Sequence, residues 1–268
     1  MAVERVAVDG LHIEIRAANP AGNRSRTRLA LGLRFATVRA PTMKTRLFIP
    51  LLATSALLAL TTASAADKDW IVLFDGKVSE RLRGFKQEGF PDKMWIIDGN
   101  ALKTVPGRGV DLITKDKFKD FELELEWKVA PGGNSGVMYR VNESVGNASW
   151  HTGPEMQILD DDKHGDGKNP KTSAGSLYAL IEPNAKKKLK PVGEFNSAKI
   201  VFKDNRVEHW LNGEKVVEFK WGSPDLQQLI TKSKFAGMPR FMKEDEGHIT
   251  FQHHGQEFWL RNVRVRRL

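Results

Sequence analysis

The sequence predicts an all-β fold of the sandwich or jelly-roll type for residues 66–268. Short segments of alternating apolar and polar residues recur there; in residues 121–127, Phe, Leu, Leu and Trp share one face and three Glu share the other. Turn residues such as Asp75-Gly76 and Asn212-Gly213 separate the segments. The absence of βαβ alternation and of a repeat of roughly 20–50 residues sets aside parallel α/β folds, propellers and solenoids.

The predicted strands are short, and each ends at a turn or a polar loop. In chain order they cover residues 70–74, 95–97, 111–114, 121–127, 136–141, 155–159, 176–180, 197–202, 206–211, 215–219, 248–252 and 258–265. Residues 223–233, with Pro224 near their start, predict a short helix. The loops at residues 160–176, 186–188 and 232–247 are polar, and the charge of the last two is most simply a solvated surface.

Residues 43–65 have the three parts of a secretory signal peptide. Met43-Lys44-Thr45-Arg46 is a positive start, an apolar stretch follows, and Ala63-Ser64-Ala65 precedes Ala66. The apolar stretch of about 14 residues is too short to span a bilayer, so we expect a periplasmic or secreted protein whose mature form lacks an integral membrane span. Residues 1–42 are interpreted as upstream sequence translated from a start codon set too early, or as a basic extension that is disordered or cleaved.

The net charge of +9 is concentrated in the part of the chain that precedes the predicted domain. Residues 1–42 contain seven Arg and only three acidic residues, and Lys44 and Arg46 add two more positive charges. This leaves about +3 for residues 66–268, so we expect no nucleic-acid partner. The lack of Cys excludes disulfides, thiolate zinc sites and a Cys nucleophile, but it does not decide the compartment.

Two predicted strands present spaced polar pairs. Glu155 and Gln157 flank Met156, and Gln252 and His254 flank His253, so each pair should project from one face of its strand. Such pairs can bind sugar hydroxyls and supply an acid or a base. An ordinary solvent-facing side of the sheet would show the same alternation.

The loop that follows residue 159 is dense in oxygen ligands. Asp160, Asp162 and His164 could hold a divalent metal such as calcium, the only cofactor that the sequence suggests. An EF-hand would need Glu where Lys171 stands and a helix on each side, so a hydrophilic loop without metal is the alternative.

Several segments together resemble the 3-keto-disaccharide hydrolase domain family, and the likeness extends over essentially all of residues 66–268. Because these motifs are spread along the chain, they are far more specific than a single glycine pattern. The segments are WIVLFDGK at 70–77, WIIDG at 95–99, FEL at 121–123, GNSGVMYR at 133–140, PEMQILD at 154–160, GEFN at 193–196, HWLNG at 209–213, QHHG at 252–255 and FWLRNV at 258–263.

The resemblance implies a concanavalin-like two-sheet antiparallel β sandwich, export from the cytoplasm, and action on 3-keto-glycosides, hence a small saccharide substrate. Two positions depart from the family pattern: Phe195 stands where Trp is usual and His253 where an acidic residue is common, which puts a metal or proton role beside His254 in doubt. The polar residues that match by position are Asn134, Arg140, Glu155, Gln157, Asp160, Asn196, His209, Asn212, Gln252 and His254.

The chemistry of a 3-keto-glycoside suggests roles for these residues. A carbonyl at C3 acidifies the C2 proton, so a base can remove it, the group at C1 can leave, and water can add later. Glu155 or His254 would be the base or acid, and Arg140 or a divalent ion would stabilise the enolate. Asn134, Gln157, Asn196, His209 and Gln252 complete the predicted substrate contacts. The alternative is a noncatalytic carbohydrate-binding module, in which Trp150, Trp210 and Trp259 would stack on sugars unless they belong to the core.

Overall fold

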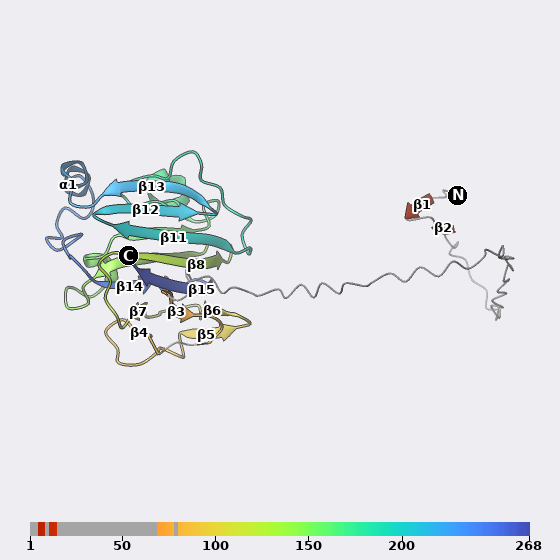
Figure 1. The fold of residues 1–268 in the computed structure, drawn as a ribbon, viewed down its shortest axis with the longest axis horizontal. Helices are drawn as coiled ribbons and strands as arrows, with labels where there is room; N and C mark the ends of the chain where they lie inside the picture. The colour runs from red at the N-terminus through yellow and green to blue at the C-terminus, as the bar shows by residue number, and fades with distance from the viewer. Residues whose placement is uncertain (1–4, 9–10, 15–68, 78–79) are drawn as a thin grey trace, which may run out of the picture. The chain divides into compact units, whose positions relative to one another are not determined.

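Two antiparallel β-sheets packed face to face form the fold of the C-terminal part of the chain, which confirms the predicted all-β sandwich (Figure 1). The computed structural model describes residues 5–8, 11–14, 69–77 and 80–268, so the predicted signal peptide at residues 43–65 lies outside the described residues. In the predicted upstream extension, β1 (Arg5–Val8) and β2 (Leu11–Glu14) form an antiparallel hairpin in a separate unit of the chain.

The larger sheet has eight strands in the spatial order β13-β12-β11-β8-β15-β6-β5, and β3 pairs with β15. Its long central strands β8 and β15 pair antiparallel along most of their length. The strands are β3 (Ile71–Phe74), β5 (Trp95–Asp98), β6 (Ala101–Thr104), β8 (Phe121–Val129), β11 (Asn196–Lys203), β12 (Arg206–Leu211), β13 (Glu214–Lys220) and β15 (Phe258–Arg267).

The smaller sheet has five strands in the order β10-β9-β14-β7-β4. It places β10 at one edge and β9 beside it, so Asn134 of β9 and Glu155 and Gln157 of β10 share one surface. The strands are β4 (Leu82–Gly84), β7 (Leu112–Thr114), β9 (Asn134–Val141), β10 (Glu155–Leu159) and β14 (His248–Phe251).

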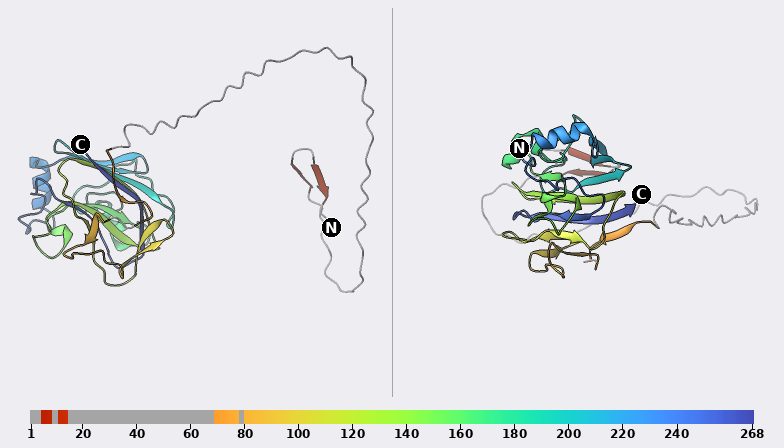
Figure 2. Two further views of the ribbon diagram at one scale, coloured as in Figure 1. Left: turned by 60° about the horizontal axis from the view of Figure 1, so that its bottom comes forward. Right: turned by 90° about the vertical axis from the view of Figure 1, so that its left-hand side faces the viewer.

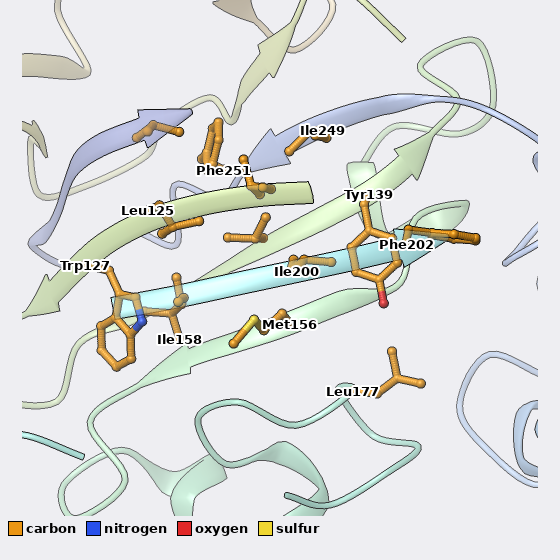
Figure 3. Packing of buried hydrophobic residues seen from close by; sticks show 14 of the residues in the cluster. Leu125, Trp127, Tyr139, Met156, Ile158, Leu177, Ile200, Phe202, Ile249 and Phe251 are labelled. Atoms are coloured by element: carbon orange, nitrogen blue, oxygen red, sulfur yellow. The ribbon is translucent and has the colours of Figure 1, made fainter. Parts of the chain in front are cut away.

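The hydrophobic core lies between the two sheets (Figure 3). Leu125 and Trp127 from β8 and Ile200 from β11 face Met156 and Ile158 from β10, and all five are almost fully buried. Burying one such side chain stabilises the fold by about 1.5–3 kcal/mol. Because strand residues alternate between faces, Glu155 and Gln157 of the same strand point away from the core.

Three connections bring further side chains to the smaller sheet. Between β9 and β10 lies the 3-10 turn η2 (Ser149–His151), and the segment after β10 contains η3 (Gly165–Lys168) and η4 (Pro170–Thr172). The third connection runs from β13 to β14. It contains the predicted helix, which is confirmed as α1 (Pro224–Thr231) and lies beside the β13 edge (Figure 1, Figure 2). Within the described ranges, no helix has both the length and the apolar character needed to cross a membrane.

The structure differs from the predicted strands in two places. The strand predicted at residues 176–180 is wrong, because Ala179 adopts a φ of 60° and Leu177 makes only isolated bridges to Met156 and Ile181. The short strands β4 and β6 were not predicted.

Candidate active site

A polar pocket lies on the outer face of the smaller sheet. Met156 and Ile158 point into the core, so the alternation of β10 turns Glu155 and Gln157 to the opposite face, as the sequence predicts. Neighbouring β9 adds Asn134 to the same pocket. The segment that follows β14 adds Gln252 and His254.

Five of the predicted catalytic and substrate-binding residues therefore meet in one hollow of about 240 Å³, which we call the Glu155 pocket. Its residues come from β9, from β10, from the segment after β14, and from the connections β9–β10, β10–β11 and β13–β14. Its lining consists of Asn134, Trp150, Gly153, Glu155, Gln157, Asp166, Tyr178, Lys234, Phe235, Gln252 and His254.

Glu155 is the most strongly perturbed carboxyl group of this pocket. Its side chain is almost completely buried, and this burial raises its pKa to about 8. The positive charge of Lys234 lowers the pKa, whereas the carboxylates of Asp111 and Asp166 raise it. Glu155 therefore carries a proton at neutral pH in the free protein, and once deprotonated it is a much stronger base than an ordinary carboxylate.

A glycine makes room for the Glu155 carboxyl group. Gly136 lies on β9 beneath this side chain, and a Cβ atom at that position would stand only 1.8 Å from Oε1 of Glu155. Any side chain there would force the carboxyl group to move. Gly136, the second glycine of the GNSGVMYR segment, thus has a structural role in the pocket.

Three buried carboxamide oxygens of this pocket have no hydrogen-bond partner within the described part of the chain. They are Oδ1 of Asn134, Oε1 of Gln157 and Oε1 of Gln252. The Nε2 group of Gln157 donates to the carbonyl of Thr172 at 3.1 Å, which fixes that carboxamide. An unpaired buried acceptor costs about 1–3 kcal/mol, so three of them at one pocket indicate a ligand that brings hydroxyl donors.

Six residues of the pocket were not predicted as catalytic or substrate-binding residues of an enzyme: Trp150, Gly153, Asp166, Tyr178, Lys234 and Phe235. Lys234 comes from the loop at residues 232–247, which looked like a solvated surface, and its Nζ lies 4.2 Å from the centre of the Tyr178 ring and 6.0 Å from that of Trp150. The hydroxyl of Tyr178 donates to Oδ2 of Asp166 at 3.1 Å. Trp150 had been considered only as a stacking residue of a binding module.

The two other Trp residues considered for sugar stacking lie away from this pocket. Trp210 on β12 and Trp259 on β15 belong to the larger sheet, where each ring has a lysine ammonium within 5 Å of its centre. Both belong to a surface of charged and aromatic side chains. Trp150, which is 36% exposed, is the one of the three that lines the Glu155 pocket.

Arg140, predicted as an enolate stabiliser, does not line the Glu155 pocket. Strict alternation along β9 would put it on the face of Asn134, but Arg140 has a φ of 51° and the pairing with β14 shifts its register at this point. The guanidinium instead lies 3.6 Å from the centre of the Phe202 ring and donates to the carbonyls of Lys119 and Glu244. This bulge removes Arg140 from the proposed enolate site.

Asn196 and His209 also lie elsewhere, because both belong to strands of the larger sheet. Oδ1 of Asn196 accepts hydrogen bonds from the backbone of Lys190 and the side chain of Asn212. His209 is fully buried between the sheets, where its Nε2 lies 3.0 Å from the Tyr139 hydroxyl and burial lowers its pKa to about 4. Neither side chain can reach a substrate in the Glu155 pocket.

The predicted metal ligands do not converge. Both oxygens of Asp160 accept backbone N–H groups, Oδ2 from Gly132 at 2.7 Å and Oδ1 from Asp162 at 3.1 Å. His164 points elsewhere, with Nε2 at 3.3 Å from the carboxamide nitrogen of Asn134. In the ranges that the structure describes, no three His, Cys, Asp or Glu side chains form a group that could hold a metal ion. The metal requirement itself stays an untested prediction.

Comparison with known proteins agrees with this fold. The model of a family described as the 3-keto-alpha-glucoside-1,2-lyase-like domain matches residues 69–266, which is nearly the whole sandwich. The chain belongs to this family. The match confirms the resemblance predicted from the dispersed sequence segments.

Relatives of this member of the lyase-like family include proteins of Bacteroides and Parabacteroides species. A 3-keto-disaccharide hydrolase of Bacteroides thetaiotaomicron is 36% identical over 227 residues, which make up 74% of this chain and 78% of that protein. The crystal structure of a candidate glycosyl hydrolase from Parabacteroides distasonis is 32% identical, has a TM-score of 0.68 and covers 76% of this chain and 95% of its own. A second from the same organism is 26% identical, with a TM-score of 0.59 and coverages of 74% and 99%.

Proposed function

We propose that this protein cleaves the glycosidic bond of 3-keto-glycosides, with Glu155 as the base that removes the C2 proton. The observation that carries the proposal is a buried carboxyl group of raised pKa in a pocket that also contains an ammonium group, an imidazole and three unpaired acceptors. The name of the Bacteroides thetaiotaomicron relative supports the substrate class.

The first step requires a strong base and a group that stabilises negative charge. Glu155 takes the proton from C2, and the electrons of that bond move towards the C3 carbonyl to form an enolate. The ammonium of Lys234 is the positive group of this pocket and is placed to stabilise the enolate oxygen. Lys234 thereby takes the role that the sequence analysis gave to Arg140 or a divalent ion.

The second step expels the group at C1, whose oxygen needs a proton. His254 lies on the exposed side of the pocket, with its Nδ1 2.9 Å from Oε1 of Gln256, so its Nε2 is directed away from this contact. Protonated His254 gives its proton to the departing oxygen as the C1–O bond breaks. Water then adds across the C1–C2 double bond: its oxygen bonds to C1 as His254 takes its proton, and Glu155 returns a proton to C2. Both residues regain their starting states, and the net reaction is hydrolysis.

Substrate binding uses the three carboxamide oxygens that lack a hydrogen-bond partner in the described part of the chain. Asn134, Gln157 and Gln252 present acceptors that sugar hydroxyls can satisfy, and a protonated Glu155 would add a donor before reaction. Because these acceptors are already buried in the free protein, a hydroxyl-rich ligand gains hydrogen bonds without desolvating them further.

The decisive experiment measures cleavage and proton removal separately. The protein is incubated with 3-keto-trehalose, both unlabelled and deuterated at C2, and release of free sugar is followed with and without chelator. We expect a primary isotope effect, and a loss of about 10²–10⁴ in kcat for Glu155→Gln, the usual contribution of a general base. Full activity of Glu155→Gln would disprove the assignment, and binding without any product would support the noncatalytic module instead.

We also propose that the protein is exported and that residues 43–65 are removed. The support is the signal-type sequence that ends at Ala65. N-terminal sequencing of protein recovered from the periplasm or medium should begin at Ala66. A cytoplasmic protein that retains Met1 or Met43 would contradict this proposal.

A further inference from the structure

A second hollow adjoins the Glu155 pocket. It has a volume of about 370 Å³ and shares Trp150, Gln252 and His254 with the Glu155 pocket, so the two hollows adjoin at these residues. We call it the outer pocket. Glu155 and Lys234 line the first hollow but not the second.

The volume of the Glu155 pocket limits what it can hold. Ligand pockets generally have volumes of about 300–1,000 Å³, and 240 Å³ falls below this range. A disaccharide in the Glu155 pocket would therefore extend beyond it. The adjoining outer pocket supplies the additional space on the side of His254.

The lining of the outer pocket suits a second sugar ring. Phe85 and Val110 belong to a small apolar cluster on this side of the sheet and form an apolar surface. Asn147 is exposed, and its carboxamide makes no hydrogen bond within the described part of the chain. Apolar contact with a ring face together with a few polar groups for its hydroxyls is the usual composition of a saccharide site.

One carboxylate holds two walls of the outer pocket in place. Oδ2 of Asp111 accepts a hydrogen bond from the Ser149 hydroxyl at 2.7 Å, which anchors the turn that carries Trp150. Oδ1 of Asp111 accepts the backbone N–H of His253 at 2.9 Å, which anchors the segment between Gln252 and His254. The wall shared with the Glu155 pocket is therefore fixed before any ligand binds.

We infer that the outer pocket binds the leaving-group sugar of the substrate while the Glu155 pocket binds the keto sugar. The inference rests on the proposed cleavage in the Glu155 pocket. The scissile C1–O bond then lies at the shared wall, within reach of His254. Asn147 contributes a hydrogen bond to the departing sugar, and the enzyme prefers a glycoside whose leaving group is a pyranose.

Two substrates distinguish this inference from the proposed function. 3-Keto-trehalose has a glucose leaving group that would fill the outer pocket, whereas methyl 3-keto-α-D-glucoside leaves it empty. The variants are Asn147→Ala, which removes a polar partner, and Ala148→Phe, which fills the outer pocket. Asn100→Ala, at an exposed turn between β5 and β6, is the matched control. Circular dichroism checks that all variants are folded.

We expect kcat/KM for 3-keto-trehalose to fall up to tenfold in Asn147→Ala, the value of one hydrogen bond, and at least tenfold in Ala148→Phe. Values for the methyl glycoside should stay within twofold of those of the unaltered protein, as should both values for Asn100→Ala. Equal losses on the two substrates, or no loss on either, would overturn the inference while leaving the proposed cleavage intact. If the unaltered protein cleaved neither substrate, the proposed function would fail and the inference with it.

Discussion

Burial of Glu155 should make the stability of the fold depend on pH in a way that Glu155→Gln removes. The pKa of Glu155 is about 8 in the folded protein and 4.5 as an ordinary value, so the folded state holds this proton when the unfolded state has already lost it. At about 1.4 kcal/mol per pKa unit, the difference corresponds to a loss of stability on the order of 5 kcal/mol as pH rises from 4.5 to 8. The contribution of the Glu155 proton to the free energy of unfolding is fully present below pH 4.5 and is absent above pH 8.

The assay is urea unfolding at pH 5 and pH 9, followed by tryptophan fluorescence. Glutamine resembles the protonated carboxyl group in shape, so Glu155→Gln should match the unaltered protein at pH 5 and exceed its free energy of unfolding by several kcal/mol at pH 9. Asp111, whose pKa is also raised by burial, is present in both proteins, so its direct contribution largely cancels. Glu182→Gln, at an exposed carboxylate, is the control. If the two proteins lost the same stability between pH 5 and pH 9, Glu155 would be ionised at neutral pH and the reasoning would be refuted.

Three further predictions concern activity on 3-keto-trehalose. Where the C2 isotope effect shows that proton removal limits kcat/KM, log kcat/KM should rise with pH with a slope near one up to about pH 8, because that step needs deprotonated Glu155 and precedes proton donation by His254; a flat profile between pH 5 and pH 8 would then contradict the role of Glu155. Gly136→Ala should lower kcat at least 10²-fold by displacing the Glu155 carboxyl group, whereas Gly89→Ala, where an added Cβ meets no atom within 4 Å, should retain the rate. Lys234→Met should lower kcat by about 10²–10³ with little change in KM, and Lys234→Arg should recover part of it; an unchanged kcat in Lys234→Met would exclude enolate stabilisation by this residue.

Local alternation predicted the part of the site that lies on regular strand. Glu155 and Gln157 face the same side because successive residues of β10 alternate, and Gln252 follows the same rule at the end of β14. Arg140 breaks the rule on β9, where its left-handed φ and the shifted pairing with β14 turn the side chain away. Nothing in the neighbouring sequence indicates this bulge, because it depends on the partner strand.

By itself, the sequence determined the all-β class, most strand positions, the family and the face of Glu155, because these depend on a residue's immediate neighbours or on motifs along the chain. Only the tertiary structure decided that Lys234 and Tyr178, from distant loops, join Glu155 and that His209 is sealed between the sheets. The same packing raises the pKa of Glu155, since removal of water from a carboxyl group requires strands and loops from several parts of the chain. Contacts between residues far apart in the chain determine which loop covers which strand. A sequence pattern with a period of two residues cannot predict these contacts, because it reflects only the nearest neighbours of each residue.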